Sequence, residues 1–122
     1  MVTEKGGLGA EVSNDTLSAG EKQLLCICRA FLKHSRIVLV DEATASIDLR
    51  NDALIQQVIK DKFAECTVLT IAHRLSTLEH SDKIIVMEAG RIVEFGTPQQ
   101  LAAQEGGFYR DMVLKNAEEF LV

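Results

Sequence analysis

The first regular pattern of apolar and polar positions begins near residue 18 and repeats every three or four residues. Apolar side chains alternate there with charged ones, which is typical of an amphipathic helix. We therefore predict a helix over residues 18–34. The segment Ile37–Val40 that follows is continuously apolar and largely β-branched, as in a strand that is covered on both faces. This succession predicts a parallel sheet with helices on each side.

The rest of the chain continues with shorter helix-like and strand-like segments. A second helix is expected from about Leu49, and a last helix from Gly107. Between them we predict a strand over residues 67–72, a helical turn over 75–80, a hairpin of 83–88 and 91–95 around Ala89-Gly90, and a helix with Pro98 in its first turn. The residues expected to face the core are Leu54, Ile55, Val58 and Ile59 in the second helix and Phe108, Met112 and Val113 in the last one.

Residues 1–16 are rich in glycine and polar side chains, and we predict an irregular lead-in there. The run Lys5-Gly6-Gly7-Leu8-Gly9 superficially suggests a loop that cradles phosphate. No Gly-Lys-Ser/Thr follows it and no apolar strand precedes it, so a plain linker is the better interpretation. The folded body is then expected over residues 17–122.

Composition limits the classes of protein to which this chain could belong. The 122 residues correspond to about one globular domain, and the net charge of −5 without a basic block argues against a nucleic-acid surface. No apolar run reaches the roughly 20 residues that span a bilayer, so membrane attachment would come from other segments or subunits. Cys26, Cys28 and Cys66 have no metal-site spacing, and we expect reduced cysteines that act as small buried hydrophobic residues.

The segment Leu17–Glu21 combines a hydroxyl and a glycine at a predicted helix start. Free backbone N–H groups and the helix dipole at such a place attract anions, and Gly20 would let a phosphate approach the backbone. An ordinary helix cap, formed by Ser18 with the acid Glu21, explains the same residues. From these residues alone, the cap is the simpler interpretation.

Two acids, Asp41 and Glu42, follow the first predicted strand, and His73 follows the second. A carboxylate at the carboxyl end of a buried parallel strand can hold Mg²⁺, and a neighbouring acid can polarise a water. The alternatives are acids that merely end a strand and a structural histidine. Asp48 likewise has an alternative task as the cap of the second helix.

The order and spacing of these segments resemble the C-terminal half of an ATP-binding-cassette (ABC) transporter nucleotide-binding domain over nearly the whole chain. The runs Gln23–Ala30 and Thr67–Leu75 resemble the second domain of the multidrug-resistance-associated C subfamily. The resemblance implies an α/β fold: a partial P-loop NTPase (ABC ATPase) three-layer core, with a parallel sheet flanked by helices and without the P-loop strand.

The resemblance also implies roles for individual residues. Leu17, Ser18, Ala19, Gly20 and Glu21 would form the signature loop that contacts the γ-phosphate of an ATP bound by the opposite domain, although Ala19 and Glu21 stand where glycine and glutamine are common. Asp41 would be the Walker B ligand of Mg²⁺, Glu42 the general base, Ser46 and Asp48 part of the D-loop at the partner domain, and His73 the switch histidine that orients Glu42 and the water.

A glycine-rich loop ending in Gly-Lys-Ser/Thr is absent from these 122 residues, as are the adenine-stacking aromatic and the Q-loop glutamine. Because the P-loop supplies much of the positioning and charge neutralisation in phosphoryl transfer, we expect no ATP hydrolysis by the isolated chain. In the implied fold, the P-loop strand lies between the strand leading to His73 and the strand 83–88. Its absence predicts unpaired sheet edges and a chain that is marginal as a monomer.

The function implied is the ATP-binding and ATP-hydrolysing part of an ABC exporter, with ATP and Mg²⁺ as cofactors. Its partners would be a second nucleotide-binding domain that supplies a P-loop, and transmembrane domains, at the cytosolic face of a membrane. The isolated chain is expected to be soluble and cytoplasmic. Two alternatives stay open: a non-catalytic fragment that donates only its signature, and a piece of an SMC/Rad50-like DNA-repair ATPase, against which the lack of coiled-coil heptads argues.

Overall fold

The structure is a computed structural model that describes residues 6–11, 16–41 and 49–121, with residues 49–52 described as backbone only. The chain divides into two compact units, Met1–Ile71 and Ala72–Val122. Each unit has its own sheet and its own apolar core. The units are therefore described one at a time.

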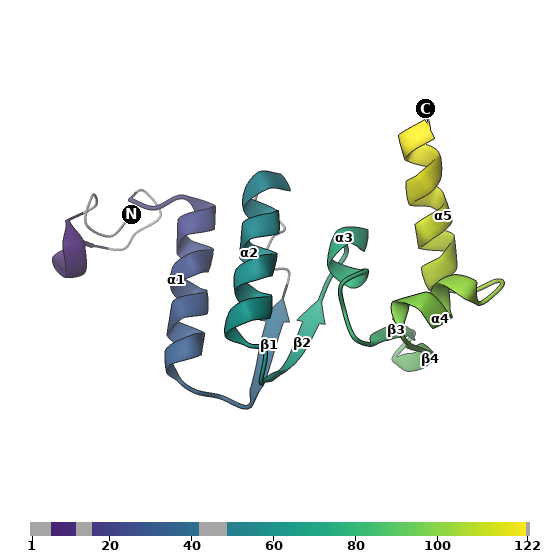
Figure 1. The fold of residues 1–122 in the computed structure, drawn as a ribbon, viewed down its shortest axis with the longest axis horizontal. Helices are drawn as coiled ribbons and strands as arrows, with labels where there is room; N and C mark the ends of the chain where they lie inside the picture. Colours follow the sequence, from purple (N-terminus) through teal and green to yellow (C-terminus); the bar gives the residue numbers. More distant parts are fainter. Residues whose placement is uncertain (1–5, 12–15, 42–48, 122) are drawn as a thin grey trace. The chain divides into compact units, whose positions relative to one another are not determined.

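The first unit alternates helices and strands (Figure 1). Its strands β1 and β2 pair in parallel, from Ile37 opposite Thr67 to Asp41 opposite Ile71. The predicted parallel arrangement is thereby confirmed for these two strands. The elements of this unit are the 3₁₀ turn η1 (Gly7–Gly9), α1 (Ala19–Leu32), β1 (Ile37–Asp41), α2 (Leu49–Lys62) and β2 (Thr67–Ile71).

Helix α1 begins and ends close to the positions that the sequence predicts. Ser18 has extended backbone angles, φ −69° and ψ 163°, and precedes the first helical residue. At the other end, His34 has a φ of 53°, in the left-handed region that turns the chain out of a helix. Three residues later the chain enters β1.

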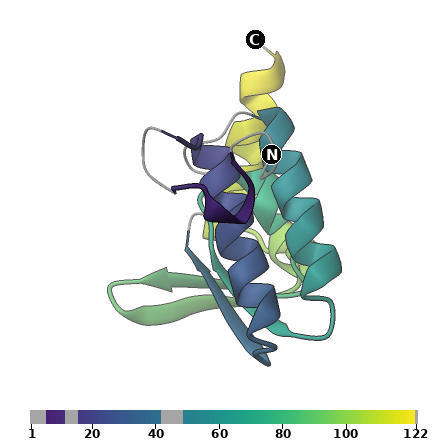
Figure 2. The same ribbon diagram turned by 90° about the vertical axis from the view of Figure 1, so that its left-hand side faces the viewer.

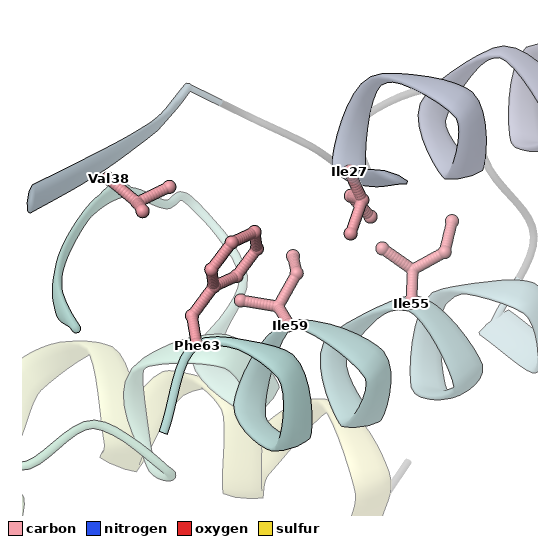
Figure 3. Packing of buried hydrophobic residues seen from close by; sticks show 5 residues of the cluster. All are labelled: Ile27, Val38, Ile55, Ile59 and Phe63. Carbon is pink, nitrogen blue, oxygen red and sulfur yellow. The ribbon is translucent and has the colours of Figure 1, made fainter. Parts of the chain in front are cut away.

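The core of the first unit is formed where α1 and α2 pack on one face of the sheet (Figure 3). Among the described side chains Ile55 is the most buried, at 1% exposure, and Ile59 lies one helical turn further along α2. Leu54, predicted to be in the core, is 54% exposed, because its position on the helix is rotated by about 100° from that of Ile55. The buried set is Ile27, Val38, Ile55, Ile59 and Phe63, with Val40 and Val68 packed against it.

The opposite face of the same sheet remains exposed. In β1, Ile37 and Leu39 are exposed, and in β2, Leu69 and Ile71 are exposed. The expectation that both faces of β1 are covered is therefore wrong for the described residues. Figure 2 shows α1 and α2 next to one another, and both contribute side chains to the core on the Val38 face.

The second unit is built on an antiparallel hairpin of β3 (Ile84–Glu88) and β4 (Arg91–Gly96). The two turn residues, Ala89 and Gly90, have φ values of 48° and 75°. Positive φ at both positions is what a type I′ hairpin turn requires, and it matches the right-handed twist of the strands. The predicted hairpin is confirmed.

Three helices complete this unit: α3 (Leu75–Leu78), α4 (Pro98–Ala103) and α5 (Phe108–Leu121). A capping box between Thr97 and Gln100 starts α4, with Pro98 at a first-turn position as predicted. The buried core consists of Leu75, Ile84, Leu101 and Tyr109, with Met112 and Val113 packed against it. Phe108, predicted to face the core, is 52% exposed, and its neighbour Tyr109 is buried instead.

Within the described ranges, β2 and β3 belong to two separate two-stranded sheets. The described helices include none that is both long and apolar enough to cross a membrane.

Candidate functional site

The predicted phosphate-binding segment lies at the amino end of α1. Ser18 Oγ accepts a hydrogen bond from the backbone N–H of Glu21 at 3.2 Å, and Glu21 Oε1 accepts one from the N–H of Ser18 at 3.5 Å. These two bonds form a capping box, so Ser18 caps α1, which is the structural alternative considered for it in the sequence analysis. Ser18 and Ala19 are exposed, and Leu17 is half-buried.

Gly20 lies in the first turn of α1, with open space beside it. A Cβ placed on Gly20 would meet no described atom within 4 Å. The first N–H groups of a helix have no partner inside the helix, and the one of Glu21 is taken by Ser18 Oγ. The N–H groups of Ala19 and Gly20 thus point out of the helix end, in a field that favours negative charge. This geometry can receive an anion.

Asp41 is the last residue of β1 and is exposed. It lies opposite Ile71, the last residue of β2, so the two parallel strands end at the same edge of the sheet. A carboxylate at that edge is accessible to a hydrated cation, and oxygen ligands are what Mg²⁺ prefers. Among the described residues there is no group of three or more His, Cys, Asp and Glu side chains that could hold a metal ion.

The amino end of α1 and the carboxyl ends of β1 and β2 lie toward the same end of the first unit (Figure 1). This follows from the topology, because α1 is connected to β1 by a short reversal and runs opposite to it. The structure thus brings Ser18 and Asp41 to one end of the unit. Glu42, Ser46 and Asp48 lie outside the described residues.

His73 follows β2 after Ala72 and is exposed, at the start of the second unit. Arg74 precedes α3 and has extended backbone angles, φ −97° and ψ 132°. The first residue of α3, Leu75, is buried in the core of the second unit. In the chain, His73 therefore lies between β2 and the short helix α3.

The cysteines differ from the expectation. All three are free, but Cys26 and Cys28 are exposed rather than buried. Ile27, between them, takes the core-facing position of α1, so its neighbours on either side point elsewhere. Cys66 is half-buried, and its Sγ donates to the carbonyl oxygen of Ser35 at 3.2 Å.

An open pocket of about 540 Å³ lies at the other end of the first unit, where the strands begin. Phe31, His34, Arg36 and Lys62 are among its lining residues. Because it lies at the amino ends of the strands, it is at the opposite edge of the sheet from Asp41. The pocket is separate from the candidate site.

The sequence is similar to proteins of one transport family. The ABC transporter family profile matches residues 4–45. ATP-binding cassette sub-family C member 2 of Rattus norvegicus is 52% identical over 105 residues, which cover 84% of this chain and 7% of that protein. The human protein of the same name is 50% identical over 108 residues, 88% of this chain and 6% of that protein. Multidrug resistance protein mrp-7 of Caenorhabditis elegans is 46% identical over 107 residues, 88% of this chain and 7% of that protein.

The chain spans only about 7% of the length of these relatives. Nevertheless, the matched stretch includes most of the 122 residues, at about half identity. This similarity agrees with the family that the order and spacing of the sequence segments indicate. The chain belongs to the ABC transporter family.

Proposed function

We propose that this chain is the C-terminal part of an ATP-binding and ATP-hydrolysing domain of an ABC exporter. The observation that carries the proposal is the register of the parallel ladder, in which Asp41 closes β1 opposite Ile71, two residues before His73. In such a domain the strand ends hold the metal ligand and the switch histidine. The fold proposed is a partial P-loop NTPase core without the P-loop strand.

In this function, Leu17, Ser18, Ala19, Gly20 and Glu21 receive the γ-phosphate of an ATP that a second domain holds. The open space at Gly20 supports a close approach of phosphate oxygens to the backbone. The exposed Ser18 hydroxyl can donate its proton to phosphate while its oxygen keeps the bond from the Glu21 N–H. Capping and phosphate binding are therefore compatible uses of Ser18.

Asp41 would hold Mg²⁺, whose charge neutralises the phosphate oxygens when the ion is bound. Glu42, directly after it, would accept a proton from the attacking water as general base. His73 would donate to the γ-phosphate and orient Glu42 and the water. Ser46 and Asp48 would contact the partner domain and its ATP.

The proposed partners are a second nucleotide-binding domain that supplies a P-loop, and the transmembrane domains of the transporter. The location proposed is the cytosolic face of a membrane, with the isolated chain soluble and cytoplasmic. The names of the relatives, which are sub-family C and multidrug-resistance proteins, favour an exporter over a DNA-repair ATPase.

An ATPase assay tests the catalytic part of this proposal. The purified chain alone should show no turnover, because the 122 residues contain no Gly-Lys-Ser/Thr loop. Turnover that disappears in Glu42→Gln would refute the inactivity of the isolated chain. A domain bearing the P-loop should restore turnover, and Glu42→Gln should abolish it again.

A cross-linking experiment tests a second candidate, in which the chain only donates its signature. The exposed Ser18 and the open Gly20 favour that candidate as well. Cross-linking to a P-loop-bearing domain should require ATP and should be lost in Ser18→Arg. Leu32→Arg, at an exposed position near the other end of α1, is the matched control and should cross-link normally. ATP-dependent cross-linking without restored turnover would select the non-catalytic candidate.

A further inference from the structure

Glu94 is an acidic side chain in the interior of the second unit. It lies in the middle of β4, opposite Val86 of β3, and only 6% of it is exposed. It is the one buried charged residue among those that the structure describes. A buried carboxylate is unfavourable unless hydrogen bonds replace its hydration. Its contacts should therefore explain why it is there.

The carboxylate binds the first turn of α5. Glu94 Oε2 accepts hydrogen bonds from the backbone N–H groups of Phe108, at 2.9 Å, and Tyr109, at 3.3 Å. Phe108 is the first residue of α5, so these are N–H groups that have no partner inside the helix. A negative charge at this place also interacts favourably with the helix dipole. Glu94 thus acts as a helix cap supplied by a strand rather than by the preceding residue.

The residue before α5 is suited to this arrangement. Gly107 has no side chain that could cap the helix, and a Cβ on it would clash with Glu94 Oε1 and lie 3.2 Å from the carbonyl oxygen of Gln104. Any other residue at 107 would displace the carboxylate. Glu94 Oε1 is itself buried and has no hydrogen-bond partner in the described part of the chain. The carboxylate therefore lies close to both the first turn of α5 and Gly107.

We propose that Glu94 is a positioning residue, whose carboxylate caps α5 and thereby holds the core on which α3 rests, next to His73. Tyr109, whose N–H is bound by Glu94, shares a buried cluster with Leu75, the first residue of α3. His73 lies two residues before Leu75. The capping does not depend on the proposed function, and only the significance of His73 rests on it.

Amide hydrogen exchange of the full 122-residue chain, measured by NMR, tests the proposal without ATP. In Glu94→Ala, the amides of Phe108 and Tyr109 should exchange about tenfold to a hundredfold faster, as expected for loss of bonds to a charged acceptor. The amides of Thr77, Leu78 and Glu79, which bond within the α3 turn, should also lose protection. Glu94→Gln keeps an oxygen acceptor without the charge, and should restore part of the protection.

Thr97→Ala is the matched control, because it removes a local cap from α4. It should accelerate exchange at Gln100 and leave Phe108 and Tyr109 unchanged. Gly107→Ala should reproduce the loss of exchange protection at the amides of Phe108 and Tyr109, although Glu94 is intact. If the amides of Phe108 and Tyr109 exchange equally fast in the parent chain and in Glu94→Ala, Glu94 does not cap α5. If exchange in Glu94→Ala becomes faster in α5 but not in α3, Glu94 is not a positioning residue for α3.

Discussion

Leu39 lies directly opposite Leu69 in the parallel β1–β2 ladder, and both side chains are on the face that α1 and α2 leave open. They are 77% and 51% exposed, and Ile37 and Ile71 extend the same apolar surface. Parallel sheets are almost always covered on both faces. Such a surface marks a place where further protein packs.

This surface should make the isolated chain self-associate. Replacing Leu39 and Leu69 together by Lys should lower association, because charged side chains cannot be buried without partners. Sedimentation velocity over a range of protein concentrations measures the change.

The matched control is Leu32→Lys, at a position in the last turn of α1 that is 71% exposed. It removes one exposed leucine from a different surface and should leave association as it is. A parent chain that stays monomeric when concentrated, with a sharp cooperative melt, would contradict the predicted marginal stability.

The capping box at Ser18 makes it possible to separate stability from phosphate binding. Ser18→Ala should lower the free energy of unfolding by about 1 kcal/mol, because the Glu21 N–H loses its acceptor. Ser18→Asp should keep the stability, since Asp caps helices as well as Ser does and its charge suits the dipole. Urea denaturation followed by circular dichroism measures both variants.

The same Asp would repel a γ-phosphate. We therefore expect Ser18→Asp to lose ATP-dependent cross-linking to a P-loop-bearing domain while it unfolds at the same urea concentration as the parent chain. Equal cross-linking by Ser18→Asp and the parent would remove Ser18 from the proposed phosphate site and leave it a role in capping only.

Ionisation of the Tyr109 phenol should lower the stability of the chain at alkaline pH. Burial raises the pKa of its phenol above the ordinary 10.0, and the negative charge of Glu79 raises it further. In the unfolded chain Tyr109 loses its proton first, so the stability that this difference provides is present below about pH 10 and is lost as the pH rises through the folded pKa. Urea denaturation at several pH values around that range should show the fall.

Two measurements assign the effect to Tyr109. It is the chain's one tyrosine and there is no tryptophan, so near-ultraviolet absorbance reports ionisation of this phenol alone. Tyr109→Phe should weaken the decline of stability with alkaline pH. A decline of the same steepness in Tyr109→Phe would assign it to other groups.

Local signals in the sequence predicted most element boundaries. Ser18 with Glu21 placed the start of α1, Ala89-Gly90 placed the hairpin turn, and Pro98 placed the first turn of α4. Each of these signals acts within four or five residues, through a hydrogen bond or a backbone angle. The parallel pairing of β1 with β2 followed from the apolar character of Ile37–Val40.

Burial was harder to predict, because it depends on which side of an element has a neighbour. Leu54 and Ile55 are equally apolar and adjacent, yet only Ile55 faces α1. Tyr109 and Glu94 are buried through contacts between residues about 15 positions apart, which no local pattern encodes. For the site, the sequence placed Asp41 at the end of its strand. The functional roles of Asp41 and of the other site residues stay predictions.

The two cores have no residue in common: one draws on residues 24–68 and the other on residues 75–113. Because each unit buries its own set of apolar side chains, we expect that heating can melt one unit while the other keeps the contacts of its core. A single transition midpoint would then be an average over two events. Unfolding of this chain is best followed by one probe in each unit. The near-ultraviolet signal of Tyr109 reports on the second unit, and a thiol label on the exposed Cys26 and Cys28 reports on the first.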